Sequence, residues 1–79
     1  MQNTIIKVRP EVKTDLLIER VREKGVKLRY LADACGIHED TLRRKIRNEQ
    51  EFKLSEIVLI SRALNLTNEE RDFLFSLNG

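Results

Sequence analysis

Residues 28–48, LRYLADACGIHEDTLRRKIRN, decide how this chain folds. They predict two short helices separated by a tight turn that contains a glycine. Leu28 and Leu31 give the first helix an apolar side. Leu42 and Ile46, four residues apart, give the second helix a narrow apolar stripe. The other faces of the second helix carry His38, Glu39, Asp40, Thr41, Arg43, Arg44, Lys45 and Arg47. We therefore expect a helix that is held along one side and presented to a partner along the rest.

The composition indicates one small domain from a reducing compartment. The chain has 79 residues and a single cysteine, Cys35, so no internal disulfide can form. No apolar run approaches the length of a membrane span. The formal net charge is +2, but residues 1–30 hold eight Lys and Arg against four Asp and Glu, and residues 54–79 hold two against four. This asymmetry permits an anionic partner.

The helical periodicity continues on both sides of the opening stretch. It predicts helices over residues 11–24, 28–35, 39–47 and 54–64, and a fifth helix from residue 68. Gly25 and Asn48 are placed to end two of these helices, and Thr67 with Glu70 predicts a capping box before the last. None of the helices is long enough to be stable alone, so we expect an all-α, compact five-helix bundle containing a helix-turn-helix. This domain covers residues 11–79 and follows a short N-terminal arm or strand at 1–10.

Three segments resemble a known family. YLADACGI at 30–37, TLRRKI at 41–46 and FKLSEIVLISRALNL at 52–66 are similar to helices two, three and four of the Cro/C1-type (lambda-repressor-like) helix-turn-helix DNA-binding domain of phage and bacterial repressors. With the flanking helices, the resemblance covers roughly residues 11–77. It implies a sequence-specific DNA-binding transcriptional regulator, a phage or prophage repressor or Cro-like protein, in the cytoplasm of a bacterial or phage-infected cell. The helix at 39–47 would read the major groove of a double-stranded DNA operator.

The resemblance also implies two sets of DNA contacts. The base contacts are His38, Glu39, Asp40, Thr41, Arg43 and Arg44, and the phosphate contacts are Lys27, Arg29, Tyr30, Arg47 and Lys53. Arg43 or Arg44 can bind guanine through two hydrogen bonds, whereas Glu39 or Asp40 can accept from the cytosine amine. Asp40 and Arg44 are also spaced to pair along the helix. The alternative is that the arginines form a solvated face and the acids complement the helix dipole.

Three predicted helix starts depart from the family pattern. Lys27, His38 and Lys53 stand where the family usually has Ser or Thr, and we expect none of them to accept well from the free backbone N–H groups. One interpretation is that DNA phosphates supply the missing acceptor beside Lys27 and Lys53. The other is that both lysines are ordinary surface residues and that the helices fray at these ends.

A homodimer is expected, because repressors of this type commonly bind pseudo-palindromic sites as two-fold dimers. The last helix has more large apolar groups than one side can hold. We expect Phe73 and Leu77 to complete the core, and Leu74 and Phe75 to be exposed as a dimer contact. The second candidate is the N-terminal arm, whose apolar residues could pair as strands across the dimer axis or whose basic residues could reach DNA; these are Ile5, Ile6 and Val8, and Lys7 and Arg9.

Other chemistry is not expected. Cys35 and His38 lack the further ligands of a zinc site, and a nucleophilic pair would need a pocket for which this domain has little room. We expect Cys35 to be a small, partly buried apolar residue, and we predict no enzyme activity, cofactor, metal site or small-molecule ligand. The rival function is a protein-interaction module on the same scaffold, an antirepressor or assembly component. Glu39 and Asp40 would then contact a protein.

Overall fold

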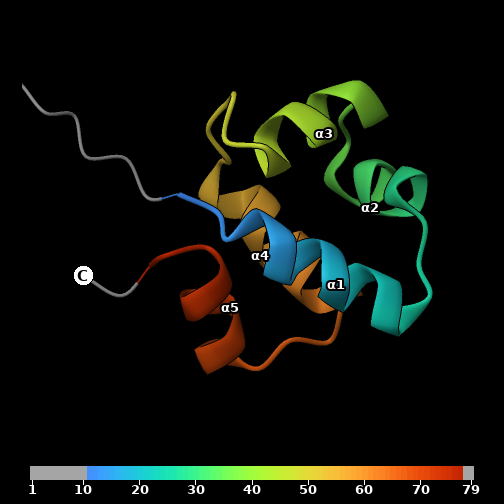
Figure 1. Ribbon diagram of the computed structural model, residues 1–79. Helices are drawn as coiled ribbons and strands as arrows, with labels where there is room; N and C mark the ends of the chain where they lie inside the picture. The colour runs from blue at the N-terminus through green and yellow to red at the C-terminus, as the bar shows by residue number, and fades with distance from the viewer. Residues whose placement is uncertain (1–10, 78–79) are drawn as a thin grey trace, which may run out of the picture.

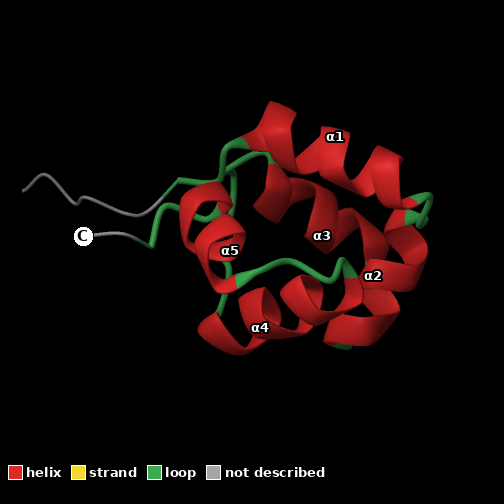
Figure 2. Ribbon diagram, turned by 90° about the horizontal axis from the view of Figure 1, so that it is seen from below, coloured by secondary structure: helices red, strands yellow, loops and turns green. Residues whose placement is uncertain are grey.

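The computed structural model describes residues 11–77, which form five helices and no strand (Figures 1 and 2). The helices are α1 Thr14–Lys24, α2 Leu28–Cys35, α3 Glu39–Ile46, α4 Leu54–Ala63 and α5 Asn68–Leu74. Within residues 11–77, the predicted all-α bundle of five helices is confirmed. None of these helices has the length and apolar character needed to cross a membrane. The predictions for the N-terminal arm fall on residues 1–10, outside the described residues.

The helices surround one apolar core. α2 packs against both α3 and α4, and α1 packs against α5. Figure 1 shows α3 along one edge of the molecule and α5 on the far side, with α1 and α4 between them. The fully or nearly buried core residues are Val12, Leu17, Val21, Leu31, Ala32, Leu42, Ile46, Ile57, Ile60, Leu64, Leu74 and Phe75. Because α3 lies at the edge, it contributes to this core from one side only.

Most helix ends follow signals in the local sequence. Gly25 and Gly36 have φ values of 70° and 69° and end α1 and α2, and Asn48, with a φ of 64°, follows α3. Left-handed backbone costs glycine little, and asparagine tolerates it better than most residues. Thr67 Oγ1 accepts from the Glu70 N–H at 3.0 Å, and Glu70 Oε1 accepts from the Thr67 N–H at 2.9 Å. The predicted capping box before α5 is therefore confirmed.

α1 begins at Thr14, three residues later than predicted. The side chain of Asn48 holds the backbone of Val12 on both sides: the Val12 N–H donates to Asn48 Oδ1 at 2.7 Å, and Asn48 Nδ2 donates to the Val12 carbonyl at 3.0 Å. These two hydrogen bonds hold Val12 in the segment that precedes the helix. α3 and α4 each end one residue earlier than predicted, at Ile46 and Ala63.

The predicted burial of Phe73 and the predicted exposure of Leu74 and Phe75 were wrong. Leu74 and Phe75 are buried, at 4% and 2% exposed, whereas Phe73 is 51% exposed. The prediction assumed a helix running through Leu77, which is half-buried. α5 instead ends at Leu74, and the chain turns at Ser76 with a φ of 55°, so that the neighbouring residues 74 and 75 both face the core. Neither of them is accessible for the dimer contact expected from the sequence.

The loop between α3 and α4 is anchored by Phe52. Its ring packs edge-on against that of Phe75, with the ring centroids 5.3 Å apart. Leu54, by contrast, is 68% exposed. It is the first residue of the helix, and the inner face of α4 is buried only from Glu56 onward.

Candidate functional site

α3 is attached to the fold along one side. Leu42, Lys45 and Ile46 are buried, while Arg43 and Arg44, on the same two turns, are exposed. The spacing of three and four residues places the buried side chains on one stripe of the helix. The structure therefore has the predicted arrangement of a helix with one held face, except that Lys45 belongs to the held face and not to the outer one.

A three-residue turn sets the position of α3 relative to α2. Gly36 adopts the left-handed conformation, and its N–H donates to the Asp33 carbonyl at 3.1 Å. The Ile37 N–H donates to the Ala32 carbonyl at 3.0 Å, and the half-buried Ile37 side chain packs on the core. His38 then starts α3 as its N-cap residue. The turn is closed by backbone hydrogen bonds and one apolar anchor, so the angle between the two helices is defined locally.

His38 caps α3, contrary to the expectation that it would be a poor acceptor. Its Nδ1 accepts from the Asp40 N–H at 3.2 Å. The physical reason is that one nitrogen of a neutral imidazole carries a free lone pair. Lys27 and Lys53 have extended backbones at the starts of α2 and α4 and make no side-chain cap hydrogen bond, as expected for an ammonium group that has no lone pair.

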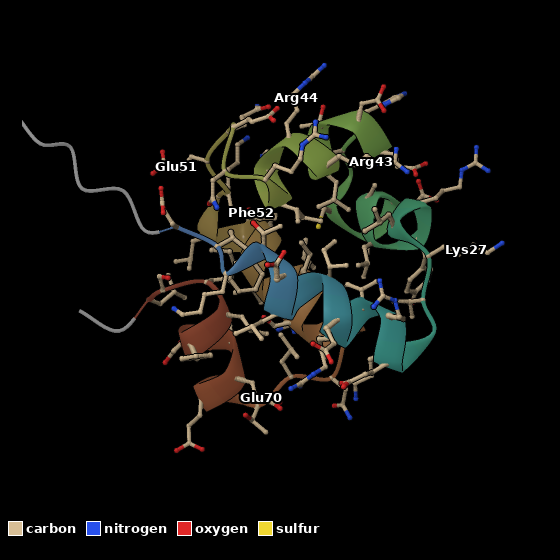
Figure 3. The ribbon with its side chains drawn as sticks, in the orientation of Figure 1. Lys27, Arg43, Arg44, Glu51, Phe52 and Glu70 are labelled. Carbon is tan, nitrogen blue, oxygen red and sulfur yellow. The ribbon has the colours of Figure 1, made fainter. Side chains whose placement is uncertain are left out.

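The two arginines at the centre of α3 have different surroundings. Arg43 lies 2.7 Å from a Glu39 carboxylate oxygen and 3.6 Å from one of Asp40, so both acids of the first turn pair with it. The predicted Asp40–Arg44 pair is absent, because Asp40 reaches Arg43 across one turn instead. Arg44 is exposed and has no ion pair or hydrogen bond from its side chain to any other described residue. Figure 3 shows it directed away from the body of the molecule.

The other residues predicted to contact bases or phosphates divide between two places. Arg29 on α2 and the start of α3, at His38 and Glu39, line one shallow hollow. Thr41 is half-buried, so only part of its side chain reaches the surface. Lys53 is exposed at the other end of α3, after the loop that follows it. The structure thus places predicted contact residues near both ends of α3.

The remaining predicted phosphate residues differ in their pairing. Lys27 and Arg29 are exposed without an ion-pair partner among residues 11–77, and Figure 3 shows Lys27 pointing outward at the start of α2. Arg47 lies 3.2 Å from a carboxylate oxygen of Glu49, at the solvent-exposed end of α3. Tyr30 is 57% exposed, so most of its surface is accessible. Four exposed side chains thus lie around α3, three of them basic.

A buried ion pair that the sequence-based predictions did not include joins α3 to α4. Lys45 Nζ lies 2.6 Å from Glu56 Oε1, and both side chains are 5% exposed. The same oxygen accepts from the Lys53 N–H at 2.8 Å, so Glu56 also caps the start of α4. Burial alone would raise the pKa of Glu56, but the hydrogen bonds from Lys45 and from the Lys53 N–H outweigh it and hold that pKa below its ordinary value. The sequence held a signal for the burial of Lys45, because Lys45 follows the apolar Leu42 by three residues and therefore lies on the same side of the helix.

Cys35 has the character expected of a small apolar residue. It is half-buried, and its thiol donates to the Glu56 carbonyl at 3.7 Å. Burial, followed by the charge of Glu56, raises the pKa of the thiol, so it stays protonated and a poor nucleophile. Across residues 11–77, no three His, Cys, Asp or Glu side chains gather as a group that could hold a metal ion.

The comparisons with known proteins leave the family of this chain open. No protein-family model matches the sequence, and neither the curated proteins nor the solved structures give a significant match.

Proposed function

We propose that this chain is a sequence-specific DNA-binding transcriptional regulator, a phage or prophage repressor or Cro-like protein, and that α3 reads the major groove. The observation that carries the proposal is the state of Arg44. It is an exposed guanidinium without a carboxylate partner among the described residues, on a helix whose opposite side is fixed by Leu42, Lys45 and Ile46. An arginine on such a helix can donate two hydrogen bonds to O6 and N7 of guanine.

Arg43 has a different role in this proposal. Because Glu39 and Asp40 both pair with it, Arg43 reduces the repulsion that two free carboxylates would meet beside DNA phosphates. The carboxylate oxygens that do not face Arg43 remain able to accept from the cytosine amine. His38 and Thr41, at the start of the same helix, complete the surface that would face the base edges.

Phosphate contacts would come from the residues around α3. Lys27 and Lys53 stand at helix starts whose backbone N–H groups donate no hydrogen bond to the side chain of the N-cap residue. An anion at such a place meets a helix N-terminus and an ammonium group together. Arg29, Tyr30 and Arg47 are exposed close to α2 and α3 and would add contacts that position the protein without reading sequence.

The salt dependence of DNA binding tests this function. Gel shifts with a random-sequence duplex at low salt should show binding, and the affinity should fall steeply as salt rises, because phosphate contacts release counterions. Lys53→Ala should lower the salt slope by about one contact. The matched control is Arg62→Ala: Arg62 is an exposed arginine that lies beside Asn68 and Arg71 of α5, away from α3. A chain that binds no duplex at low salt is not a DNA-binding regulator.

One observation favours the rival function, a protein-interaction module that acts as an antirepressor or assembly component. Outside the buried Lys45, the segment from residue 39 to residue 49 carries three carboxylates and three guanidinium groups, and most of them are paired with each other. A surface of balanced charge suits a protein partner as well as it suits DNA. The same low-salt gel shift separates the two functions, because such a module would leave the duplex unshifted.

A further inference from the structure

The hollow between α1 and α5 carries two large apolar side chains that the fold leaves exposed. Leu16 of α1 is 45% exposed and Phe73 of α5 is 51% exposed, and both line a single hollow of about 290 Å³. Exposed apolar groups that gather at a depression with a polar rim mark interaction sites. We call this hollow the α1–α5 groove. The rest of its lining is the buried Leu74 and four charged side chains, Glu19, Arg20, Glu23 and Glu70.

Each wall of the α1–α5 groove is one stripe of a helix. Its α1 residues stand at positions 16, 19, 20 and 23, and its α5 residues at positions 70, 73 and 74, a spacing that places side chains on one face of a helix. The Lys13 N–H donates to the Leu74 carbonyl at 2.9 Å, so the start of α1 lies beside the end of α5. Arg20, further along α1, meets Glu70 near the start of α5 at 2.6 Å. The two helices therefore run in opposite directions, and the groove is apolar toward the end of α5 and charged toward its start.

The charged end has more carboxylates than it pairs. Three glutamates and one arginine line it, which gives a net charge of −2. Arg20 is engaged, with Nε 3.2 Å from Glu23 Oε1 and Nη1 2.6 Å from Glu70 Oε2. Glu70 Oε1 accepts from the Thr67 N–H, so both oxygens of Glu70 have partners. Glu23, whose side chain is 59% exposed, meets Arg20 through one oxygen, and the exposed Glu19 has no ion pair or side-chain hydrogen bond within residues 11–77. Glu19 and Glu23 can therefore bind cations of a partner.

The cation nearest the apolar end is already engaged within the chain. Lys13 Nζ lies 4.5 Å from the centroid of the Phe73 ring and 3.0 Å from the Phe73 carbonyl oxygen, and it contacts Ser76 Oγ at 3.2 Å. Lys13 is thus held at this end and does not neutralise Glu19 or Glu23. The Phe73 side chain remains half exposed with Lys13 in place, so an apolar group of a partner can pack on its accessible part.

We propose that the α1–α5 groove binds an amphipathic helix of another protein, one with apolar side chains on one turn and Lys or Arg on a later turn of the same face. The apolar side chains pack on Leu16 and Phe73, and the basic ones pair with Glu19 and Glu23. Leu16 and Glu23 are seven residues apart, which is about 10 Å along a helix, so the two sets of partner side chains stand about two turns apart. A helix that is anchored in a groove by residues at helical spacing is a recurring mode of recognition.

The charge of the groove favours such a partner over a second copy of this chain. Two copies in contact would bring together two surfaces of the same negative charge, with Glu19 and Glu23 of each left without a new cation, whereas a basic helix supplies the missing partners. The groove contains none of the residues proposed to contact DNA, and Figure 3 shows Glu70 on α5 and Arg44 on α3 at opposite ends of the molecule. The inference therefore goes beyond the proposed function, and the helix and DNA can be bound at the same time.

Binding of two synthetic peptides to the full chain tests the groove. The first is an amphipathic helical peptide of alanine with leucine on one turn and lysine two turns later on the same face, and the second has glutamate in place of each lysine. Fluorescence anisotropy of the labelled peptides measures their affinities. The lysine peptide should bind about tenfold or more tightly than the glutamate peptide, and its affinity should fall as the salt concentration rises.

Matched variants locate the bound peptide. Phe73→Ala should weaken binding of the lysine peptide about tenfold or more, because it removes an apolar anchor. Glu19→Lys should weaken it about threefold to tenfold, because it reverses a charge at the acidic end. The controls are Leu54→Ala and Glu51→Lys, which change another exposed leucine and another exposed glutamate outside the groove and should alter the affinity by less than about twofold. Circular dichroism establishes that each variant is folded, and Glu19→Lys changes only an exposed side chain, so it tests the groove even where Phe73→Ala unfolds the chain.

Four results would overturn the inference. The chain binds neither peptide, it binds both with equal affinity, or the control variants weaken binding as much as Phe73→Ala and Glu19→Lys do. The fourth is a wild-type chain whose self-association in sedimentation is abolished by Phe73→Ala, because the groove would then belong to a second copy. Gel shifts keep the two proposals separate: a chain that shifts duplex DNA and binds neither peptide contradicts only the groove, and a chain that binds the lysine peptide in the groove and shifts no duplex contradicts only the proposed function.

Discussion

Lys45 and Glu56 form a buried ion pair in which Nζ lies 2.6 Å from Oε1, and this pair connects α3 to α4. Buried charges are tolerated only when each has a partner and good hydrogen bonds. Glu56 Oε1 also accepts from the Lys53 N–H, so one carboxylate both binds Lys45 of α3 and caps the first turn of α4. The helix that carries Arg44 is therefore held by a charge pair as well as by apolar contacts.

Breaking this pair should be far more costly than removing it. Lys45→Met leaves a buried carboxylate and Glu56→Leu leaves a buried ammonium, so each should lower the free energy of unfolding by about 3–5 kcal/mol. The double variant Lys45→Met/Glu56→Gln removes both charges and keeps an acceptor for the Lys53 N–H, and it should recover most of that loss. Urea unfolding followed by circular dichroism measures all three.

The exposed pair of Arg47 and Glu49 is the control for that series. Its side chains are 59% and 52% exposed, so Arg47→Met should change the free energy of unfolding by no more than about 1 kcal/mol. If Lys45→Met is as mild as Arg47→Met, or if the double variant is as unstable as the two single losses added together, the buried pair does not hold α3 as described.

The lowered pKa of Glu56 predicts a loss of stability in acid. Because the folded protein holds this carboxylate ionised to lower pH than the unfolded chain does, the unfolded chain binds more protons below the ordinary glutamate pKa of about 4.3. Stability is therefore complete above that pH and falls as the pH drops toward the lowered pKa. Glu70 adds to the same trend, because the Thr67 N–H and then Arg20 lower its pKa.

Urea unfolding at a series of pH values from about 3 to 7 measures this dependence. The free energy of unfolding of Lys45→Met/Glu56→Gln should fall less steeply below about pH 4.3 than that of the wild-type chain. Equal slopes for the two proteins would show that Glu56 is not held ionised by its surroundings.

What the sequence predicts correctly here is mostly local. Gly25, Gly36 and Asn48 end helices within a few residues of where their conformational preferences place them, and Thr67 and Glu70 form the expected box. These features depend on residues that are neighbours in the chain. The helix count and the all-α class follow from the same kind of information.

What the sequence did not predict depends on contacts between distant segments or on the exact end of a helix. Lys45 and Glu56 are eleven residues apart and meet only once α3 packs against α4. Phe75 lies in the core, where Phe73 was predicted, because α5 ends at Leu74. Within the candidate site, Asp40 is spaced to pair with either Arg43 or Arg44, and the spacing alone did not decide that it pairs with Arg43.

The helix starts at Lys27 and Lys53 give a test of the phosphate contacts. Lys27→Ser and Lys53→Thr should each stabilise the free chain by up to about 1 kcal/mol, because they supply a cap acceptor. Both should weaken DNA binding, since they remove an ammonium group and occupy the N–H groups that a phosphate would use. Thermal unfolding and gel shifts on the same preparations measure the two effects. Variants that gain stability and keep full affinity would assign these lysines to the ordinary surface.

The central claim is that Arg44 reads a base, and selection of bound sequences from a random DNA pool tests it most directly. The wild-type chain and the Arg62→Ala control should select the same two-fold related site, with a guanine at one position of each half. Arg44→Ala should lose that preference and bind the selected site about 1–3 kcal/mol more weakly for each guanine that it no longer binds, while its affinity for random duplex changes little. An equal loss of affinity on the selected site and on random duplex would contradict the claim.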